Sequence, residues 1–441
     1  MRFANQLAMV ALLAITAINF NPTPTNAQTS VFCPPNFPVF QAGSCTSVDG
    51  KHGSLGVPAL ATQSVNQVSQ SITQQSNAAT IEALRRRRAQ EAASPGATSG
   101  ALMFAPQSLV ELPYQNSTPF APPPPKAYVI APVDTGIHSA VWAYGFGGFE
   151  NRTANSQTTF HDTTQLPLPV NVNIVSNTGV WGVVSGADLT FPGLGPRGGT
   201  LIAGLLTGYM ESNVDLLGVS TSATASNPGT STGTAHVRLS GPSAGAYATI
   251  FQGPISADLT FKADFLNIND SFFQSLDCCS APVLSGGTAS SHVDNFSTVG
   301  NFNYRFPLYS AIWIEPTVGF NYTYSLYDSS AQALGLASGY VLRLQEGARV
   351  GLDFYCNDIH VTPTIAGLLY DDVVVTGGPI VNGFFVGGDL LPSDEGKLRA
   401  QGILTLNVDY RNGLSSFASA TIYGGEDLFG AGGKAGLRYQ W

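Results

Sequence analysis

The sequence is poor in charged residues. Only 11% of its 441 residues are Asp, Glu, Lys or Arg, whereas soluble domains carry about 25%. The net charge is −9, which argues against a general nucleic-acid binder. Five cysteines are too few for a disulfide scaffold, and the adjacent Cys278 and Cys279 are poorly placed to bridge each other. Cys33 and Cys45 are spaced for a small disulfide loop, which the sequence leaves open.

Motifs that carry chemistry are also missing. No Cys/His cluster has zinc spacing, and the chain contains no GxSxG elbow, HExxH pair or P-loop. The six histidines are scattered, and Ser291-His292 stands without a surrounding motif. We therefore predict no enzymatic activity, no catalytic, cofactor-binding or metal-binding residue, and no cofactor. A barrel lipase is the enzymatic alternative.

Long apolar runs are confined to the N-terminus. Met1 and Arg2 precede an apolar run from Leu7 to Ile18, and Thr25-Asn26-Ala27 follows as a small-residue cleavage site. This pattern predicts a secretory signal peptide over residues 1–27, with an uncleaved membrane anchor as the alternative. No uninterrupted apolar run of about 18 residues follows Gln28, so no transmembrane helix is expected.

What the chain does contain is glycine, aromatic residues and strand-like alternation. It has 48 Gly, 25 Phe and 16 Tyr. From Ser139 onward, apolar and polar residues alternate in twelve segments, as in Ile255 to Phe265. Such alternation predicts strands with one apolar and one polar face, although a soluble sandwich alternates in the same way. The segments lie near residues 139–150, 179–191, 200–213, 234–252, 254–269, 296–308, 310–325, 340–355, 358–371, 397–411, 414–424 and 433–441.

The connections between these segments alternate in length. Tight turns such as Gln252-Gly253-Pro254 and Asn412-Gly413 follow the even-numbered strands. Longer loops follow the odd-numbered strands, at 151–178, 214–233, 270–295, 326–339, 372–396 and 425–432. Short turns at one rim and long loops at the other are typical of outer-membrane barrels. An exported chain without membrane helices can span a membrane only as a closed barrel. The even strand count then places both barrel ends and Cys356 at the periplasmic rim, and Cys278 and Cys279 outside.

The residues before the barrel divide into three regions. Residues 28–58 form a short irregular segment rich in Pro, Gly and Ser. Residues 59–92 lack Gly and Pro and carry Val65, Val68 and Ile72 at roughly helical spacing, which predicts a helix. Residues 93–138 form a Pro-rich linker, and its run Pro122 to Pro125 is expected to be stiff and extended.

Several segments together resemble the autotransporter β-domain, the translocator of type V secretion. They are the opening strand Val141 to Gly148, Val183 to Phe191, Leu201 to Tyr209, Gly245-Ala246-Tyr247 and the closing strand Gly436 to Trp441. The resemblance covers residues 139–441. It implies an outer-membrane protein of a Gram-negative cell, in contact with outer-membrane lipid and inserted by the barrel-assembly machinery. The resemblance also implies that Leu437, Tyr439 and Trp441 form a C-terminal barrel-assembly signal.

In this family, a helix just before the first strand sits in the pore and leads the passenger outside. Here a Pro-rich linker separates the helix from the barrel, which departs from the usual arrangement. A barrel of this size is wide enough for one helix, and we predict that the helix plugs or lines the pore. A solvated amphipathic helix in the periplasm is the alternative. The predicted pore-lining residues are Arg85, Arg86, Arg87, Arg88, Asp258, Asp264, Glu315, Arg343, Arg349, Asp353, Asp409 and Arg438.

The predicted fold is therefore all-β, a 12-stranded antiparallel transmembrane β-barrel over residues 139–441, preceded by a helix and a linker. The predicted function is an autotransporter-type barrel that translocates or anchors a very short N-terminal passenger. A porin-like channel, or a surface adhesin or structural barrel acting through its long outer loops, are the alternatives. The exported cargo, the solute, the ligand of the loops and the oligomeric state are left open by the sequence.

Overall fold

A computed structural model describes residues 30–32, 39–41, 44–46, 73, 76, 77, 80, 136–160, 168–194, 199–222, 230–277, 283–309, 311–329, 336–356, 359–377, 395–410 and 412–441. The predicted signal peptide, Arg85 to Arg88, Cys33 and the Cys278-Cys279 pair lie outside these residues. So does the Pro-rich linker up to residue 135. Of the predicted helix over residues 59–92, four residues are described.

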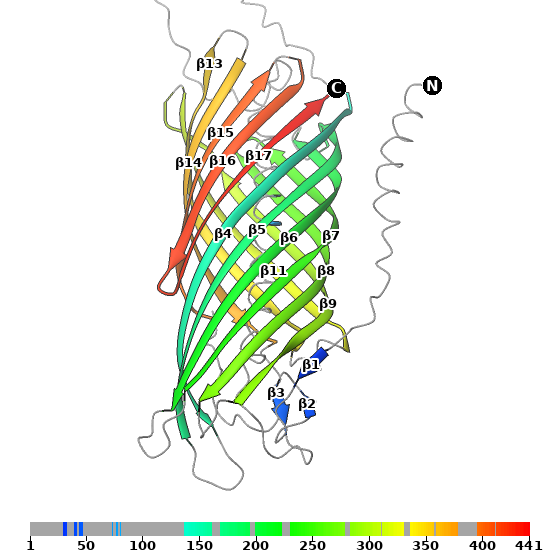
Figure 1. Ribbon diagram of the computed structural model, residues 1–441. Helices are drawn as coiled ribbons and strands as arrows, with labels where there is room; N and C mark the ends of the chain where they lie inside the picture. Colours follow the sequence, from blue (N-terminus) through cyan, green and yellow to red (C-terminus); the bar gives the residue numbers. More distant parts are fainter. Residues whose placement is uncertain are drawn as a thin grey trace, which may run out of the picture.

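Twelve long strands of the described chain close into one antiparallel barrel (Figure 1). Consecutive long strands pair with each other. β9 pairs directly with β11, because the short β10 lies in the turn between them, and β17 pairs with β4 to seal the ring. The predicted 12-stranded antiparallel barrel is thus confirmed. The strands are β4 (His138–Phe160), β5 (Leu168–Pro192), β6 (Thr200–Ser222), β7 (Thr230–Gln252), β8 (Ile255–Asp277), β9 (Val283–Tyr304), β11 (Ile312–Tyr327), β12 (Gly339–Leu352), β14 (Ile359–Val375), β15 (Arg399–Tyr410), β16 (Leu414–Gly425) and β17 (Leu428–Gln440).

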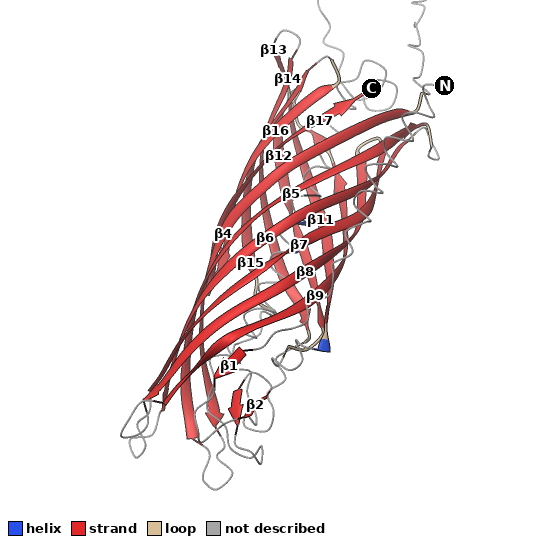
Figure 2. Cartoon of the chain, turned by 45° about the vertical axis from the view of Figure 1, so that its right-hand side comes forward, coloured by secondary structure: helices blue, strands red, loops and turns tan. Residues whose placement is uncertain are grey.

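Five short strands complete the sheets. β10 (Phe306–Pro307) and β13 (Phe354–Cys356) border the tight turns, and Cys356 is exposed with a free thiol. β2 (Val39–Gln41) and β3 (Ser44–Thr46) pair with each other. β1 (Ser30–Phe32) pairs antiparallel with β9, where residues 286–288 lie beyond the reach of β11. An N-terminal strand is therefore added to the barrel wall at the end opposite the tight turns (Figures 1 and 2).

The two ends of the barrel meet at the rim of tight turns. The N–H of Ser139 donates to the carbonyl of Trp441 at 3.2 Å, and the N–H of Trp441 donates to the carbonyl of Ser139 at 3.0 Å. Figure 1 shows the C-terminus at this rim, together with β13. The predicted placement of both barrel ends at one rim is correct, and we call it the short-turn rim.

The turn between β15 and β16 shows how sequence sets these connections. Gly413 has a φ of +81°, a conformation that side chains other than glycine rarely adopt. A Cβ at this position would also lie 2.2 Å from the carbonyl oxygen of Gln440. The N–H of Leu414 donates to Oδ1 of Asn412 at 3.1 Å, so the Asn-Gly pair turns the chain within two residues.

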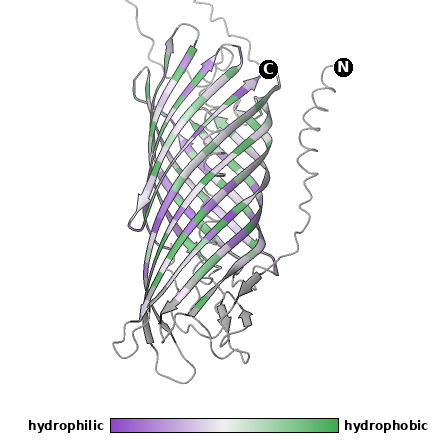
Figure 3. Cartoon of the chain, in the orientation of Figure 1, coloured by the Kyte–Doolittle hydropathy of each residue, from purple (hydrophilic) through white to green (hydrophobic). Residues whose placement is uncertain are grey.

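The outer face of the barrel is apolar near the short-turn rim. Side chains there alternate between an exposed outer face and a buried inner face, and apolar and polar colours alternate along the strands in Figure 3. Val183, Phe261, Ile365, Leu404 and Leu437 stand outward, each more than half exposed. An apolar outer band around a polar interior is the arrangement of a barrel in lipid. No helix within the described residues is long and apolar enough to cross a membrane.

Half of the wall is much taller than the other half. β4 to β8 have 23 to 25 residues and β9 has 22, whereas β15 and β16 have 12. A membrane-spanning strand needs only about 9–11 residues. The outer parts of β4 to β9 therefore stand beyond the lipid, and we call them the projecting sheet. It comprises residues 151–160, 168–178, 211–222, 230–240, 266–277 and 283–294.

The polarity of the two faces is exchanged where the projecting sheet begins. On the outer face of β6, the half-exposed Tyr209 is followed by Glu211 and Asn213. On the inner face of β8, Lys262 and Asp264 are followed by Leu266 and Ile268, which are buried. The outer face of β6 thus changes from apolar to mainly polar, and the inner face of β8 changes from polar to largely apolar, where the projecting sheet begins.

This exchange corrects three predicted loops. The residues expected to be loops at 151–178, 214–233 and 270–295 are mostly strand in β4 to β9. The lipid-facing alternation in the sequence ends at the exchange, because the apolar residues move to the opposite face there. For the predicted loop at 372–396, β14 continues to Val375, and residues 378–394 lie outside the described chain.

Candidate functional site in the barrel lumen

A fully buried ion pair stands on the inner wall. Lys262 and Asp264 are two residues apart on β8, so both side chains point into the barrel. Nζ of Lys262 lies 2.6 Å from Oδ1 of Asp264, and neither side chain is exposed. Charges withdrawn from water are tolerated when they are paired and hydrogen-bonded. The pair therefore presents a compensated but strongly polar surface to whatever fills the lumen.

Four residues of the predicted helix are described, and all are fully buried. Thr73, Ser76, Asn77 and Thr80 have helical backbone and no solvent exposure. Residues three and four apart share one helix face, so these side chains form a single polar stripe. Oγ1 of Thr80 donates to the carbonyl of Ser76 at 3.0 Å, one helical turn earlier. The helix over residues 59–92 as a whole stays a prediction.

Two strands contact the beginning of this stripe. Nζ of Lys262 donates to Oγ of Ser76 at 2.6 Å. Nδ2 of Asn295, on β9, donates to Oγ1 of Thr73 at 2.9 Å. Asn295 and Asp264 are directly paired between β8 and β9, so both contacts belong to one patch of the wall.

The other end of the stripe contacts β4. Oγ1 of Thr80 lies 2.9 Å from the hydroxyl of Tyr144, near the beginning of β4 at the short-turn rim. The partner of Thr73 is Asn295, near the middle of β9. With increasing residue number, the four helical residues therefore approach the short-turn rim.

An aromatic and charged chain crosses the seam where β17 meets β4. Nε1 of Trp142 donates to the hydroxyl of Tyr247 at 2.8 Å, and this hydroxyl donates to Oδ2 of Asp188 at 3.0 Å. Arg438 donates to the other oxygen of Asp188 at 3.1 Å. Trp142 also stacks on Tyr144, with ring centroids 5.6 Å apart. Arg438 on β17 is thereby connected to Asp188 on β5, across β4.

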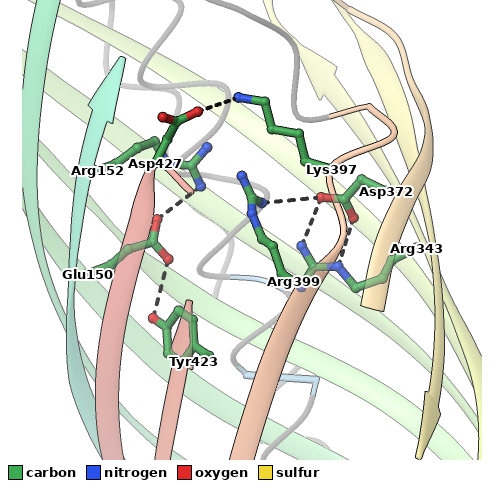
Figure 4. Close-up of polar contacts among 8 residues, drawn as sticks. All are labelled: Glu150, Arg152, Arg343, Asp372, Lys397, Arg399, Tyr423 and Asp427. Atoms are coloured by element: carbon green, nitrogen blue, oxygen red, sulfur yellow. Dashed lines mark hydrogen bonds and ion pairs between the residues drawn. The ribbon is translucent and has the colours of Figure 1, made fainter. Parts of the chain in front are cut away.

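A second network lies at the long-loop end of the shorter strands (Figure 4). Arg343 donates to both oxygens of Asp372 at 2.7 and 2.9 Å, and Arg399 lies 3.8 Å from the same carboxylate. The guanidinium of Arg343 also stacks on the ring of Tyr370, 4.2 Å from its centroid. This bidentate geometry holds β12, β14 and β15 together at the outer mouth.

The same mouth is charged on its other side. Glu150 accepts from Arg152 at 3.1 Å and from the hydroxyl of Tyr423 at 3.3 Å. Nζ of Lys397 lies 2.9 Å from Oδ2 of Asp427. Figure 4 shows both groups beside the pair of Arg343 and Asp372. The outer mouth is thus lined by charges of both signs.

A third network lies at the short-turn rim. His360 on β14 lies between two carboxylates, 3.3 Å from Oδ1 of Asp353 and 3.4 Å from Oδ2 of Asp409. Asp353 is also paired with Arg305 and accepts from the hydroxyl of Thr362 at 2.9 Å. These contacts link the tight turns of neighbouring hairpins.

The structure places most of the predicted pore-lining residues on the inner face. They are Asp258, Asp264, Glu315, Arg343, Arg349, Asp409 and Arg438, and Asp353 stands at the short-turn rim. Arg85 to Arg88 lie outside the described residues. The predicted pore-lining set lacks Lys262 and Asp188, and it lacks the hydroxyl side chains of the helix. The polar spacing of Thr73, Ser76, Asn77 and Thr80 was the available signal.

Among the described residues, no cluster of three or more His, Cys, Asp and Glu side chains is arranged for metal binding. The lumen described above offers hydrogen-bonding and charged groups that are largely paired with one another. Its chemistry is suited to contacting a polar helix.

A family profile matches most of this barrel. The profile of the autotransporter beta-domain matches residues 141–421. Among solved structures, the β domain of the Bordetella autotransporter BrkA is 14% identical, with a TM-score of 0.41, over 69% of this chain and 99% of that one. The transport unit of AIDA-I from Escherichia coli is 14% identical, with a TM-score of 0.42, over 68% and 90%.

The translocator domain of NalP from Neisseria meningitidis is 13% identical, with a TM-score of 0.31, over 69% of this chain and 88% of that one. Among curated proteins, no sequence matches this chain at a significant level. The family profile extends over more than half of the chain and over eleven of the twelve barrel strands. The chain therefore belongs to the autotransporter β-domain family and is an outer-membrane β-barrel of type V secretion.

Proposed function

We propose that this barrel translocates its own short N-terminal passenger, residues 28–58, and then anchors it at the cell surface. In this proposal the helix over residues 59–92 fills the pore, and the linker over residues 93–138 returns to the first strand. The hydrogen bond between Lys262 and Ser76 carries the proposal, because it joins the inner wall to the chain before the barrel.

The direction of the chain supports this function. β1 pairs with β9 at residues 286–288, in the projecting sheet. Thr73 contacts the middle of β9, and Thr80 contacts β4 close to the short-turn rim. β4 itself begins at that rim. A chain that runs from the outer mouth through the lumen to the inner rim is the path of an exported N-terminus still attached to its barrel.

Surface exposure of the N-terminus tests translocation. An epitope tag inserted after Gly43 is expected to bind antibody on intact cells, because β1, which ends at Phe32, pairs with β9 in the projecting sheet. A second tag inserted in the tight turn after Asn412 serves as the periplasmic control. A first tag that is detected only after the outer membrane is opened would refute translocation.

Conductance tests the plug. The triple variant Thr73→Val, Ser76→Ala and Thr80→Val removes the hydroxyl groups that contact the wall, and we expect larger single-channel conductance in planar bilayers. Reversal of Arg85 to Arg88 to Glu tests the predicted contact with the lumen acids in the same assay. Thr232→Val, on the exposed outer face of the projecting sheet, is the control. Unchanged conductance in the triple variant counts against the plug, and high conductance of the unaltered protein favours a porin-like channel.

The last strand supports recognition by the barrel-assembly machinery. Leu437, Tyr439 and Trp441 stand on the outer face with 58, 47 and 41% of their surface exposed. The rings of Tyr439 and Trp441 are stacked, with centroids 5.8 Å apart. This apolar, aromatic edge is available to a partner before the barrel is sealed. We assign the protein no enzymatic reaction and no cofactor.

A further inference from the structure

The projecting sheet has an apolar inner face that is fully buried. Its central side chains come from β5 to β9 and are at most 3% exposed. They are Ile174, Val214, Val237, Leu266, Ile268 and Val293. The opposite face is mainly polar, with Asn151 and Asn177 hydrogen-bonded at 2.7 Å and Asn155 and Asn173 at 2.6 Å. This is the pattern of a water-exposed sheet that packs against a second layer.

The described strands supply only the border of that second layer. Tyr327, at the end of β11, and Leu336, before β12, join the apolar cluster. Both lie at one side of the sheet, because β11 pairs with β9 only up to Val293. For a face this wide to be completely buried, a further segment of the protein has to cover the inner side of β5 to β8.

The N-terminal chain is fixed at both ends of this face. Phe32 pairs with Gly286 of β9, and Thr73 accepts a hydrogen bond from Asn295 of the same strand. These two positions on β9 are about 30 Å apart at the rise of a strand. The chain between Phe32 and Thr73 is about forty residues long and would reach over 100 Å if extended. This chain is therefore long enough to fold back between its two attachment points, beside the inner face.

The composition of this chain suits an apolar partner. Residues 33–72 include Leu55, Val57, Leu60, Val65 and Val68, and their only Asp, Glu, Lys or Arg residues are Asp49 and Lys51. The chain is thus nearly uncharged and carries apolar side chains along its length. Burying such side chains against the sheet contributes about 25 cal/mol for each Å² of apolar surface removed from water.

We propose that residues 33–72 of this chain dock on the apolar inner face of the projecting sheet, with β1 holding the edge of β9. The docked segment and the sheet form one small surface domain over the outer mouth of the barrel. The sheet then acts as the surface on which the exported segment folds, and the passenger is retained. This inference rests on the proposed function, because the segment has to reach the outside first.

Two adjacent phenylalanines provide a matched test by photo-cross-linking on intact cells. Phe272 is 5% exposed on the inner face, and Phe273 is 50% exposed on the outer face. Each is replaced in turn by p-benzoylphenylalanine, and the adducts are mapped by mass spectrometry. We expect position 272 to form adducts with peptides from residues 33–72 and position 273 to form none with them. Adducts from position 272 to another protein, to lipid or to no partner would overturn the proposal.

A second pair of variants tests the apolar character of the contact. Ile268→Asp places a charge on the buried inner face, and Asn269→Asp places one on the exposed outer face. We expect added protease to cleave residues 33–72 on intact cells in I268D and to spare them in N269D, while both barrels keep heat-modifiable gel mobility. Equal protection in a folded I268D barrel contradicts docking. If I268D does not fold, the cross-linking pair decides.

The surface tag after Gly43 separates the two proposals. A tag on the surface together with absent cross-links overturns docking and leaves translocation intact. A tag retained in the periplasm overturns translocation, whatever the cross-links show.

Discussion

Replacement of Lys262 by Met tests the energetics of the lumen. Lys262 and Asp264 are fully buried, with Nζ and Oδ1 only 2.6 Å apart. The variant leaves Asp264 without its counter-ion, and breaking a buried pair in this way costs about 3–5 kcal/mol. The lost hydrogen bond to Ser76 adds about 0.5–1.5 kcal/mol. We expect the free energy of unfolding to fall by about 4–6 kcal/mol.

Urea titration of the refolded protein in liposomes measures this change, with tryptophan fluorescence and heat-modifiable gel mobility as readouts. The double variant Lys262→Met with Asp264→Leu removes both charges and is expected to recover most of the loss, because well-packed apolar pairs replace buried ion pairs at little cost. Lys397→Met is the control. Its pair with Asp427 is 26% and 34% exposed, and such pairs contribute about 0.2–1 kcal/mol. A loss in K262M no larger than that in K397M would refute the assignment of a buried, coupled pair.

Three further changes test other parts of the molecule. Burial raises the pKa of Asp270, in the projecting sheet, from 3.8 to about 7 against the opposing charge of His236. The folded sheet keeps a proton that the unfolded chain releases above about pH 4, so its stability decreases as the pH rises toward 7. Protease is therefore expected to nick the projecting sheet faster as the pH rises from about 4 to 7. Asp270→Asn is expected to abolish this pH dependence of nicking, and an unaltered dependence would contradict the prediction. Glu346 stands on the outer face opposite Val318, in the apolar band. Glu346→Leu is expected to raise the free energy of unfolding by about 1–2 kcal/mol in the urea titration, and a decrease would reveal a partner for the carboxylate. Trp441→Ala is expected to lower the amount of heat-modifiable barrel in outer-membrane fractions, and an unchanged amount would exclude Trp441 from assembly.

The barrel itself could be predicted because its signal is repeated in every strand. Alternation as in Ile255 to Phe265 and turns such as Asn412-Gly413 identify strands and connections locally. The outer halves of the tall strands could not be found in this way. From Leu266 onward the apolar residues of β8 lie on the inner face, so the period of two persists while its phase is reversed. Reading that reversal as a continuing strand requires knowing where the lipid ends.

The lumen contacts were less predictable than the fold. Acidic residues such as Asp258 and Asp264 were expected on the inner face, since they alternate with apolar residues in their strands. The contacts to Ser76 and Thr73 join residues that are some two hundred positions apart. Small hydroxyl groups form no motif of their own, and their partners are set only when the barrel closes.

The unequal height of the wall also gives the outer opening an orientation. On the side of β4 to β9 the wall continues well past the lipid, and on the side of β15 and β16 it ends close to the bilayer surface (Figure 1). The opening is therefore oblique and faces sideways, across the low rim. In the proposed export, a peptide that leaves the lumen therefore crosses the low rim, next to the neighbouring lipid headgroups.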